Sequence, residues 1–236
     1  MHTIKMSAAA LERGKKNRGG RDHAFETFDP ARTAHVIVDL QNGFMEEGAV
    51  SEIPVARDIV PNVNALSQAI RAAGGTNIFL RYTYDPNEKI AWTSWYGDML
   101  GTPFSEGLRK GFAAGEHDHA LWPELDVAEG EPVLDKTRFS GFTQGTCDLH
   151  KVLQELDVDT VLITGTVTNC CSEATARDAQ QLSYKVIFLS DGNAALNDDE
   201  HNGTLDSLYP VFADVRTTKE VIGLLNAGAA TRTAAE

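Results

Sequence analysis

The strongest indication of fold and chemistry lies in residues 160–181, which read TVLITGTVTNCCSEATARDAQQ. A β-branched apolar run opens this stretch, a short polar turn follows, and a helix-forming run from Glu173 to Gln181 closes it. Cys170 and Cys171 stand where the helix is expected to begin. The first N–H groups of a helix are unpaired and its N-terminus carries partial positive charge, so a thiol there should ionise more readily. The stretch therefore predicts a strand–turn–helix unit that presents a nucleophilic cysteine.

The same alternation of strand and helix continues along the chain. Apolar residues three and four positions apart mark the helical stretches, as in Ile59, Val63, Leu66 and Ile70. Strands are predicted at 35–39, 77–82, 132–136, 160–165, 185–190 and 211–215, and helices at 55–73, 143–155, 170–183, 199–209 and 217–225. This pattern predicts an α/β fold, a three-layer sandwich in which a mostly parallel sheet of about six strands has helices on both faces.

Two segments lie outside this alternation. Residues 1–29 are predicted to form a polar N-terminal arm, mobile or lying along a partner, because they include a basic, glycine-rich stretch and no apolar period. Residues 83–130 are rich in tryptophan, glycine and proline, and long excursions of this kind often form lids or pocket walls. Residues 30–236 are predicted to form a single domain.

Composition limits the classes of partner. The formal net charge of −13 disfavours nucleic acid, whose phosphates would be repelled. No apolar run approaches the roughly 20 residues that a bilayer span needs, so no membrane association is expected. The 3 cysteines cannot form a paired framework and no secretory signal opens the chain, which together favour a cytoplasmic location.

Two further reactive side chains are predicted near the cysteines. Ligands of such sheets bind outside the carboxyl ends of the strands, and Asp39 and Lys136 each end a predicted strand. Burial would raise the pKa of Asp39 and suit it as a general base, although it could instead cap the following turn. Lys136 could activate a thiol and orient the carboxylate, or be a solvated loop lysine. Either Cys170 or Cys171 could be the nucleophile, and Cys147 is expected in the core.

Three segments carry a resemblance to a known family. They read VDLQNGF at 38–44, KTRFSGF at 136–142 and GTVTNCCSE at 165–173. Together they resemble the motifs of the isochorismatase-like cysteine hydrolases over about residues 34–225. Within that superfamily the chain looks most like the branch of N-carbamoylsarcosine, ureidoacrylate, biuret and triuret amidohydrolases.

The resemblance assigns roles to the residues that match these motifs. It implies a catalytic triad of Asp39 as the base, Lys136, and Cys171 rather than Cys170 as the nucleophile. It also implies a cis peptide bond between Val167 and Thr168, with the N–H groups of Thr168 and Cys171 aimed at an oxyanion. Homo-oligomers, dimers or tetramers, are common in the family and are expected here.

Departures from other branches narrow the expected activity. The isochorismatases proper lack the cysteine, so Cys171 argues against vinyl-ether hydrolysis. Nicotinamidases hold a metal through an Asp-x-His pair and a further histidine, whereas residues 81–86 read RYTYDP. We therefore expect no metal and no cofactor. His117 and His119 flank Asp118 and could form a metal site or belong to a solvated loop.

The predicted function is hydrolysis of a C–N bond in a small ureido, carbamoyl or carboxamide compound through a thioester, releasing ammonia or an amine. The alternatives are a nicotinamidase-like amidase and a non-catalytic α/β binding protein; a redox sensor is disfavoured because adjacent cysteines form a strained disulfide. Arg138 could bind a substrate carboxylate or form a surface ion pair, and the aromatic candidates could be lid core instead. The substrate-binding candidates are Gln41, Asn42, Phe44, Trp92, Trp95, Arg138 and Asn169.

Overall fold

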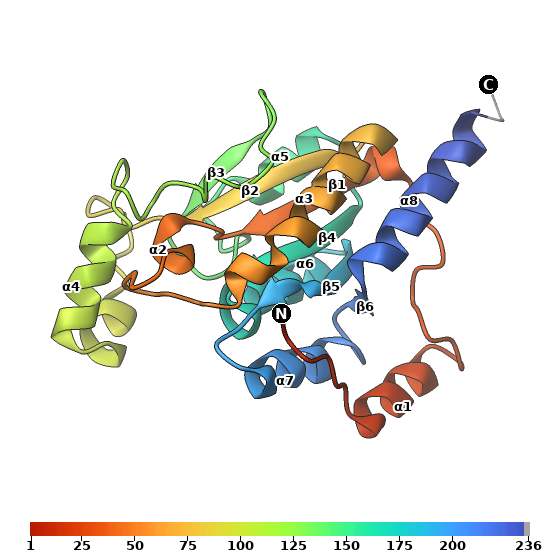
Figure 1. Cartoon of the computed structure of the whole chain (residues 1–236), viewed down its shortest axis with the longest axis horizontal. Coiled ribbons are helices and arrows are strands. Elements are labelled where there is room, and N and C mark those ends of the chain that lie inside the picture. The colour runs from red at the N-terminus through yellow and green to blue at the C-terminus, as the bar shows by residue number, and fades with distance from the viewer. Residues whose placement is uncertain (234–236) are drawn as a thin grey trace.

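A six-stranded parallel sheet forms the centre of the structure, a computed structural model that describes residues 1–233 (Figure 1). The strands are β1 (Thr33–Val38), β2 (Thr76–Tyr82), β3 (Val133–Lys136), β4 (Thr160–Thr166), β5 (Lys185–Ala194) and β6 (Asp214–Arg216). Their order is β3-β2-β1-β4-β5-β6, and every neighbouring pair is parallel. The predicted α/β class and strand number are confirmed.

Helices cover both faces of the sheet, as the sequence predicts. On one face, apolar residues of α3 and α8 pack on β4 and β5, and on the other face α5, α6 and α7 pack on β1, β4 and β5 (Figure 1). The helices are α1 (Ala8–Asn17), α2 (Asn42–Met45), α3 (Ala56–Ala73), α4 (Thr102–Gly111), α5 (Leu149–Glu155), α6 (Glu173–Gln181), α7 (Asp198–Leu208) and α8 (Thr218–Thr233). A 3-10 turn, η1 (Pro30–Arg32), and two π-helical turns, η2 (Ser94–Met99) and η3 (Thr168–Ser172), complete the elements.

Local signals explain where the main elements begin and end. All six residues of β1 are buried, which is typical of a parallel strand covered on both faces and accounts for its β-branched sequence. Helix α3 is capped at its C-terminus by Gly74, which adopts a left-handed conformation (φ 86°). Residues with a Cβ adopt this conformation only at a cost in free energy. The last strand begins three residues later than predicted, at Asp214, because Val211 and Phe212 continue the turn that follows α7.

The N-terminal arm is packed on the domain, in contrast to the mobile tail that its composition indicated. Helix α1 lies against α7, with Ser7 accepting a hydrogen bond from the Ala10 N–H at its start. Gly14 allows this approach, since a Cβ there would lie 2.3 Å from the Tyr209 ring. The helix was missed because it has no apolar stripe of its own.

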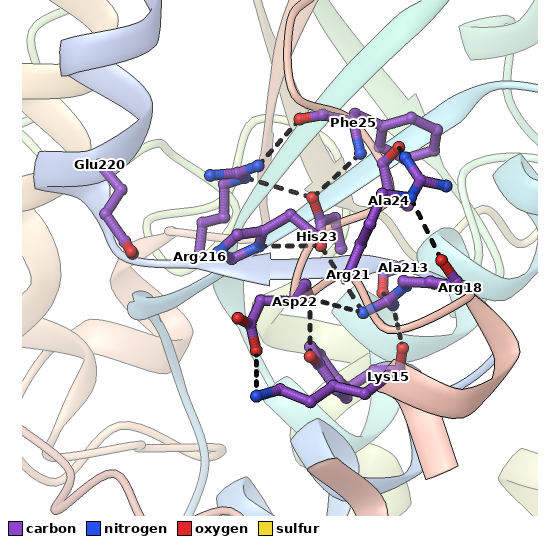
Figure 2. A network of polar contacts seen from close by, with 12 residues as sticks. Lys15, Arg18, Arg21, Asp22, His23, Ala24, Phe25, Ala213, Arg216 and Glu220 are labelled. Atoms are coloured by element: carbon purple, nitrogen blue, oxygen red, sulfur yellow. Dashed lines mark hydrogen bonds and ion pairs between the residues drawn. The ribbon is translucent and has the colours of Figure 1, made fainter. Parts of the chain in front are cut away.

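The segment after α1 is tied to β6 by a polar network, which Figure 2 shows. The Arg18 guanidinium lies over the Tyr209 ring, 4.3 Å from its centroid, and donates to the Ala213 carbonyl. Buried Asp214 contacts His23 Nδ1 at 3.1 Å, and the Arg216 guanidinium donates to both Asp214 and the Phe25 carbonyl. These contacts hold the arm along the last strand.

Within the described part of the chain, no helix combines the length and the apolar composition that crossing a bilayer requires.

Candidate active site

The carboxyl ends of β1 and β3 bring Asp39 and Lys136 into contact. Lys136 Nζ donates to Asp39 Oδ2 at 2.7 Å, and both side chains are 0% exposed. Between them lies β2, whose Tyr82 ring is 5.4 Å from the ammonium. Lys136 Nζ also donates to the Arg138 carbonyl at 3.1 Å. The other carboxylate oxygen, Asp39 Oδ1, is buried and has no hydrogen-bond partner among the described residues.

Burial and pairing have opposite effects on these two groups. Burial raises the pKa of Asp39, and the charge of Lys136 opposes that rise. Burial also works against the charged form of Lys136, but the neighbouring Asp39 and Cys171 raise its pKa above the ordinary value. Lys136 is therefore an ammonium, and Asp39 has more affinity for a proton than an exposed aspartate has.

The cysteine turn reaches this pair because β4 approaches β1 very closely. Gly165 (φ 124°) has no room for a side chain, since a Cβ would lie 2.0 Å from the Val38 carbonyl oxygen. Asp39 itself adopts a positive φ of 54°, which turns its side chain out of the strand direction at the sheet edge. The two unusual backbone conformations lie side by side, since Val38 pairs with Gly165.

The turn differs from the sequence expectation in two ways. The cis peptide bond joins Thr166 and Val167, so the expectation of a cis bond between Val167 and Thr168 is wrong by one residue. The reason is that β4 stays extended through Thr166, and the turn therefore begins at Val167. In addition, Cys171 belongs to η3, and α6 starts only at Glu173.

Cys171 is buried and Cys170 is half-buried. A hydrogen bond with Cys170 and burial raise the pKa of the Cys171 thiol, Asp39 adds to the rise, and Lys136 opposes it. The same bond from Cys171 lowers the pKa of Cys170. Cys171 is accordingly a neutral thiol at rest, whereas its place near a helix start indicated a thiolate. The hydrogen bond with Cys170 and burial favour the neutral thiol here.

A cavity of about 130 Å³ opens beside the thiol. Its walls come from the cysteine turn, from the excursion after β2 and from the segments that follow β1 and β3. The lining residues are Phe44, Ser51, Tyr82, Trp95, Phe104, Leu108, Phe139, Val167, Cys170 and Cys171. A larger groove of about 930 Å³ runs along residues 83–90 and reaches Gly145 and Thr146, but its lining does not include either cysteine of the turn. The smaller cavity is therefore the candidate substrate site.

Phe44 and Trp95 are the substrate-binding candidates that line this cavity. Trp92 packs behind them, with its ring centroid 5.7 Å from that of Trp95 and 4.7 Å from that of Phe139. Arg138 lies over the Trp92 ring at 4.8 Å and does not line the cavity.

The amide candidates are engaged elsewhere. Gln41 donates to the Tyr82 and His119 carbonyls at 3.0 and 2.9 Å and accepts from the Tyr82 N–H, so it braces the loop after β1 against the end of β2. Asn42 donates to the His117 carbonyl at 3.0 Å. Exposed Asn169 donates to Glu200 at 3.1 Å. None of these three side chains lines the described cavity.

His117 and His119, which flank Asp118 in the sequence, lie in different environments. His117 is exposed and contacts Glu46 at 2.6 Å, and possible ligand atoms of Glu46, His117 and Asp118 lie within 4.8 Å of one another. His119 is buried and contacts the Thr83 hydroxyl at 2.9 Å. The sequence motif of two histidines flanking an aspartate is therefore divided between a surface cluster and the interior.

Several residues of the site had no clear sequence signal. Tyr82 and Phe139 adjoin the ends of predicted strands, and Phe104 and Leu108 are four residues apart in the excursion, a spacing that could have indicated a helix wall. His201 was also missed: its Nδ1 accepts from the Thr168 hydroxyl at 2.9 Å and its Nε2 donates to the Ser190 carbonyl. It fixes the base of the cysteine turn.

A buried carboxylate, ammonium and thiol at the carboxyl edge of a parallel sheet define a candidate cysteine-hydrolase site on an α/β fold. The chain belongs to the isochorismatase family, since residues 33–220 match the isochorismatase domain. Among solved structures, it resembles a cysteine hydrolase from Pseudomonas syringae pv. phaseolicola 1448A, with a TM-score of 0.78 and 30% identity over 87% of this chain and 98% of that one.

Curated relatives of the chain include an isochorismatase family protein and an amidohydrolase. An uncharacterized isochorismatase family protein of Bacillus subtilis, YwoC, is 31% identical over 195 residues, which cover 82% of this chain and 94% of the relative. The ureidoacrylate amidohydrolase RutB of Agrobacterium fabrum is 29% identical over 216 residues, covering 86% and 94%. An N-carbamoylsarcosine amidase structure from Thermoplasma acidophilum, at 24% identity and a TM-score of 0.64, shares the fold.

Proposed function

We propose that this protein is an amidohydrolase that cleaves a carbon–nitrogen bond of a small ureido, carbamoyl or carboxamide compound through a thioester on Cys171. The observation that carries the proposal is the buried Asp39–Lys136 pair beside a cysteine that opens into a cavity. The amidohydrolases among the relatives support the reaction class.

The first step is transfer of the Cys171 proton to Asp39. The thiol is neutral at rest, so a base is required, and Asp39 Oδ1 is a buried acceptor with no partner among the described residues. Burial raises the pKa of Asp39, and the Cys171 thiol is among the neighbouring groups that oppose this rise, so the two side chains interact. Lys136 holds Asp39 through its other oxygen and stabilises the thiolate as it forms.

The thiolate then attacks the substrate carbonyl carbon, and the carbonyl oxygen becomes an oxyanion. N–H groups of the turn from Val167 to Cys171 are the candidate donors to it. Asp39 returns its proton to the nitrogen as the C–N bond breaks, and ammonia or an amine leaves. Water, deprotonated by Asp39, attacks the thioester, the acid leaves and Cys171 recovers its proton. Nucleophile, base and stabilising charge all come from side chains, so the proposed reaction is metal-independent.

Ammonia release by the purified, EDTA-treated protein tests this reaction. A suitable panel contains ureidoacrylate, N-carbamoyl amino acids, biuret, triuret, maleamate and nicotinamide. Cys171→Ala should abolish release from any substrate found while the thermal unfolding midpoint stays close to that of the wild type. Mass spectrometry of the quenched enzyme should show an acyl adduct on the peptide that carries Cys171.

Cys170→Ala is the matched control, because it removes the neighbouring thiol and leaves the proposed nucleophile. It should retain turnover. Substantial activity in Cys171→Ala, together with loss in Cys170→Ala, would show that the nucleophile is wrongly assigned.

A further inference from the structure

We propose that the cavity beside Cys171 accepts an uncharged group about the size of a benzene ring, so that the substrate is a small neutral amide or urea and not a carboxylate-bearing one. This inference rests on the proposed function and deepens it by naming the substrate class.

The size follows from the volume of the cavity. It measures about 130 Å³, and an apolar protein cavity of about 150 Å³ is known to hold benzene. The amide that reacts must lie against Cys171, so only a short acyl or alkyl group can accompany it inside.

The lining is apolar or neutral. Phe44, Phe104, Leu108, Phe139 and Val167 contribute hydrocarbon surface. The polar lining groups are the Ser51 and Tyr82 hydroxyls, the Trp95 indole and the two thiols. Burial raises the pKa of Tyr82, so its hydroxyl stays un-ionised. Within the described part of the chain, no charged side chain lines this cavity.

Lys136 and Arg138, two cationic side chains of the segment around the end of β3, are already paired with carboxylates. Lys136 is bound to Asp39. Arg138 donates to Glu88 at 2.5 Å and to the Ile90 carbonyl at 2.6 Å, and the two charged side chains are only 12% and 14% exposed. Arg138 therefore does not serve as the carboxylate receptor that its sequence position had indicated.

A substrate carboxylate in this cavity would be desolvated without a partner. It would also approach Asp39 and the thiolate that forms on Cys171, so repulsion would grow as the reaction proceeds. Burying an unpaired charge is costly enough to reject a ligand, whereas an apolar group of similar size gains from the same surroundings. Ureidoacrylate carries a carboxylate, so the inference separates this chain from its relatives of that name.

Matched substrate pairs test the inference during turnover. Propylurea and 3-ureidopropionate differ in a terminal methyl against a carboxylate, and so do butyramide and succinamate. We expect kcat/KM for ammonia release to be at least about 100-fold higher for the neutral member of a pair that is turned over. Equal or higher values for the anionic member would overturn the inference and leave the proposed function standing.

A second measurement does not depend on turnover. Iodoacetamide and iodoacetate alkylate thiols and differ in charge at nearly equal size. In a Cys170→Ala background, the ratio of their rates at Cys171, normalised to N-acetylcysteine, should favour iodoacetamide by at least about 10-fold. A normalised ratio near one would overturn the inference. If this preference holds but no amide or urea is hydrolysed, the proposed function fails and the cavity preference remains.

Phe104→Arg should weaken the preference for the neutral compound. Phe104 lines the cavity but is 39% exposed, so a guanidinium there can be solvated when the cavity is empty and can pair with a carboxylate when it is not. We expect the neutral-to-anionic ratio to fall by about 10-fold or more in both assays. Phe104→Leu is the control and should leave the ratio unchanged. An unchanged ratio in Phe104→Arg, with the protein folded, would also count against the inference.

Discussion

Replacing Lys136 by methionine should destabilise the protein strongly, because it leaves Asp39 buried without its partner. The two side chains meet at 2.7 Å and are both 0% exposed, so no solvent can replace the lost ammonium. Removing one member of such a pair costs about 3–5 kcal/mol. That is a large part of a total stability of about 5–15 kcal/mol. For a chain of this length, each kcal/mol lowers the unfolding midpoint by about 2–4 °C, so we expect a drop of about 6–20 °C.

The double variant Asp39→Asn/Lys136→Met is the matched control. It removes both charges and preserves similar side-chain volumes, and asparagine tolerates the positive φ of 54° at position 39 better than most residues. Because replacing a whole buried ion pair is often close to neutral, its stability should lie within about 2 kcal/mol of the wild type. The two changes together should therefore cost less than Lys136→Met alone.

The deficit of Lys136→Met should depend on pH. Burial raises the pKa of Asp39, and in the variant no ammonium opposes the rise. A carboxyl group whose pKa is higher in the folded than in the unfolded state stabilises the fold at low pH, and this contribution is lost as pH rises through the folded-state value. Lys136→Met should accordingly lie closer to the wild type at pH 5 than at pH 7. Calorimetric melts of the wild type, both single variants and the double variant at the two pH values measure this. Equal midpoints for Lys136→Met and the double variant at pH 7 would refute the reasoning.

Other variants should show the following changes in unfolding by urea or heat. Gly165→Ala should lower the free energy of unfolding by more than about 3 kcal/mol, since the added Cβ would lie 2.0 Å from a backbone oxygen. Gly203→Ala in α7 meets open space and should raise it by about 0.5–1 kcal/mol. Equal effects of the two substitutions would contradict the close approach of β4 to β1. Burial lowers the pKa of His35 to about 3, so the stability that its neutral form contributes is present above the unfolded-state pKa of 6.5 and is lost as pH falls. Between pH 7 and 4.5 the unfolding free energy of the wild type should fall by about 3 kcal/mol more than that of His35→Gln. Parallel curves of stability against pH for the two proteins would count against this. His2→Ala should cost about 1–3 kcal/mol, because the His2 ring stacks on His201 at 4.4 Å and accepts from the Ala195 N–H; wild-type stability in this variant would show that the arm contributes little.

The sheet could be predicted from the sequence because its central strands, β1 and β4, are buried on both faces. Such strands require β-branched apolar runs, and the one at β4 is flanked by turn residues that mark its ends. The positions of Asp39 and Lys136 followed from the same runs, since a polar residue directly after a buried strand lies at the edge of the sheet. Their contact across β2 depends on strand order, which the periodicity alone does not specify.

The parts that were missed depend on tertiary contacts. Helix α1 has no apolar stripe, and its place is fixed by Gly14 against Tyr209 and by Arg18, residues nearly 200 positions apart from their partners. Residues 83–130 were expected to form a lid or pocket wall, but Phe104 and Leu108 of α4 were not identified as the residues that line the cavity. The pKa of the Cys171 thiol depends on the hydrogen bond with Cys170 and on burial, so a rule about helix termini alone gave the opposite direction.

The buried Asp39–Lys136 pair favours a catalytic role over a stabilising one. Apolar residues of similar volume would fill the same position at comparable or lower free energy, so a buried ion pair is weak evidence for a stabilising role. One oxygen of Asp39 is held by Lys136 while the other has no partner among the described residues, an arrangement that a purely structural carboxylate does not need. A base that must take a proton from a buried thiol needs one oxygen fixed and the other available. The double variant therefore separates the two roles, since it should keep the fold and lose turnover.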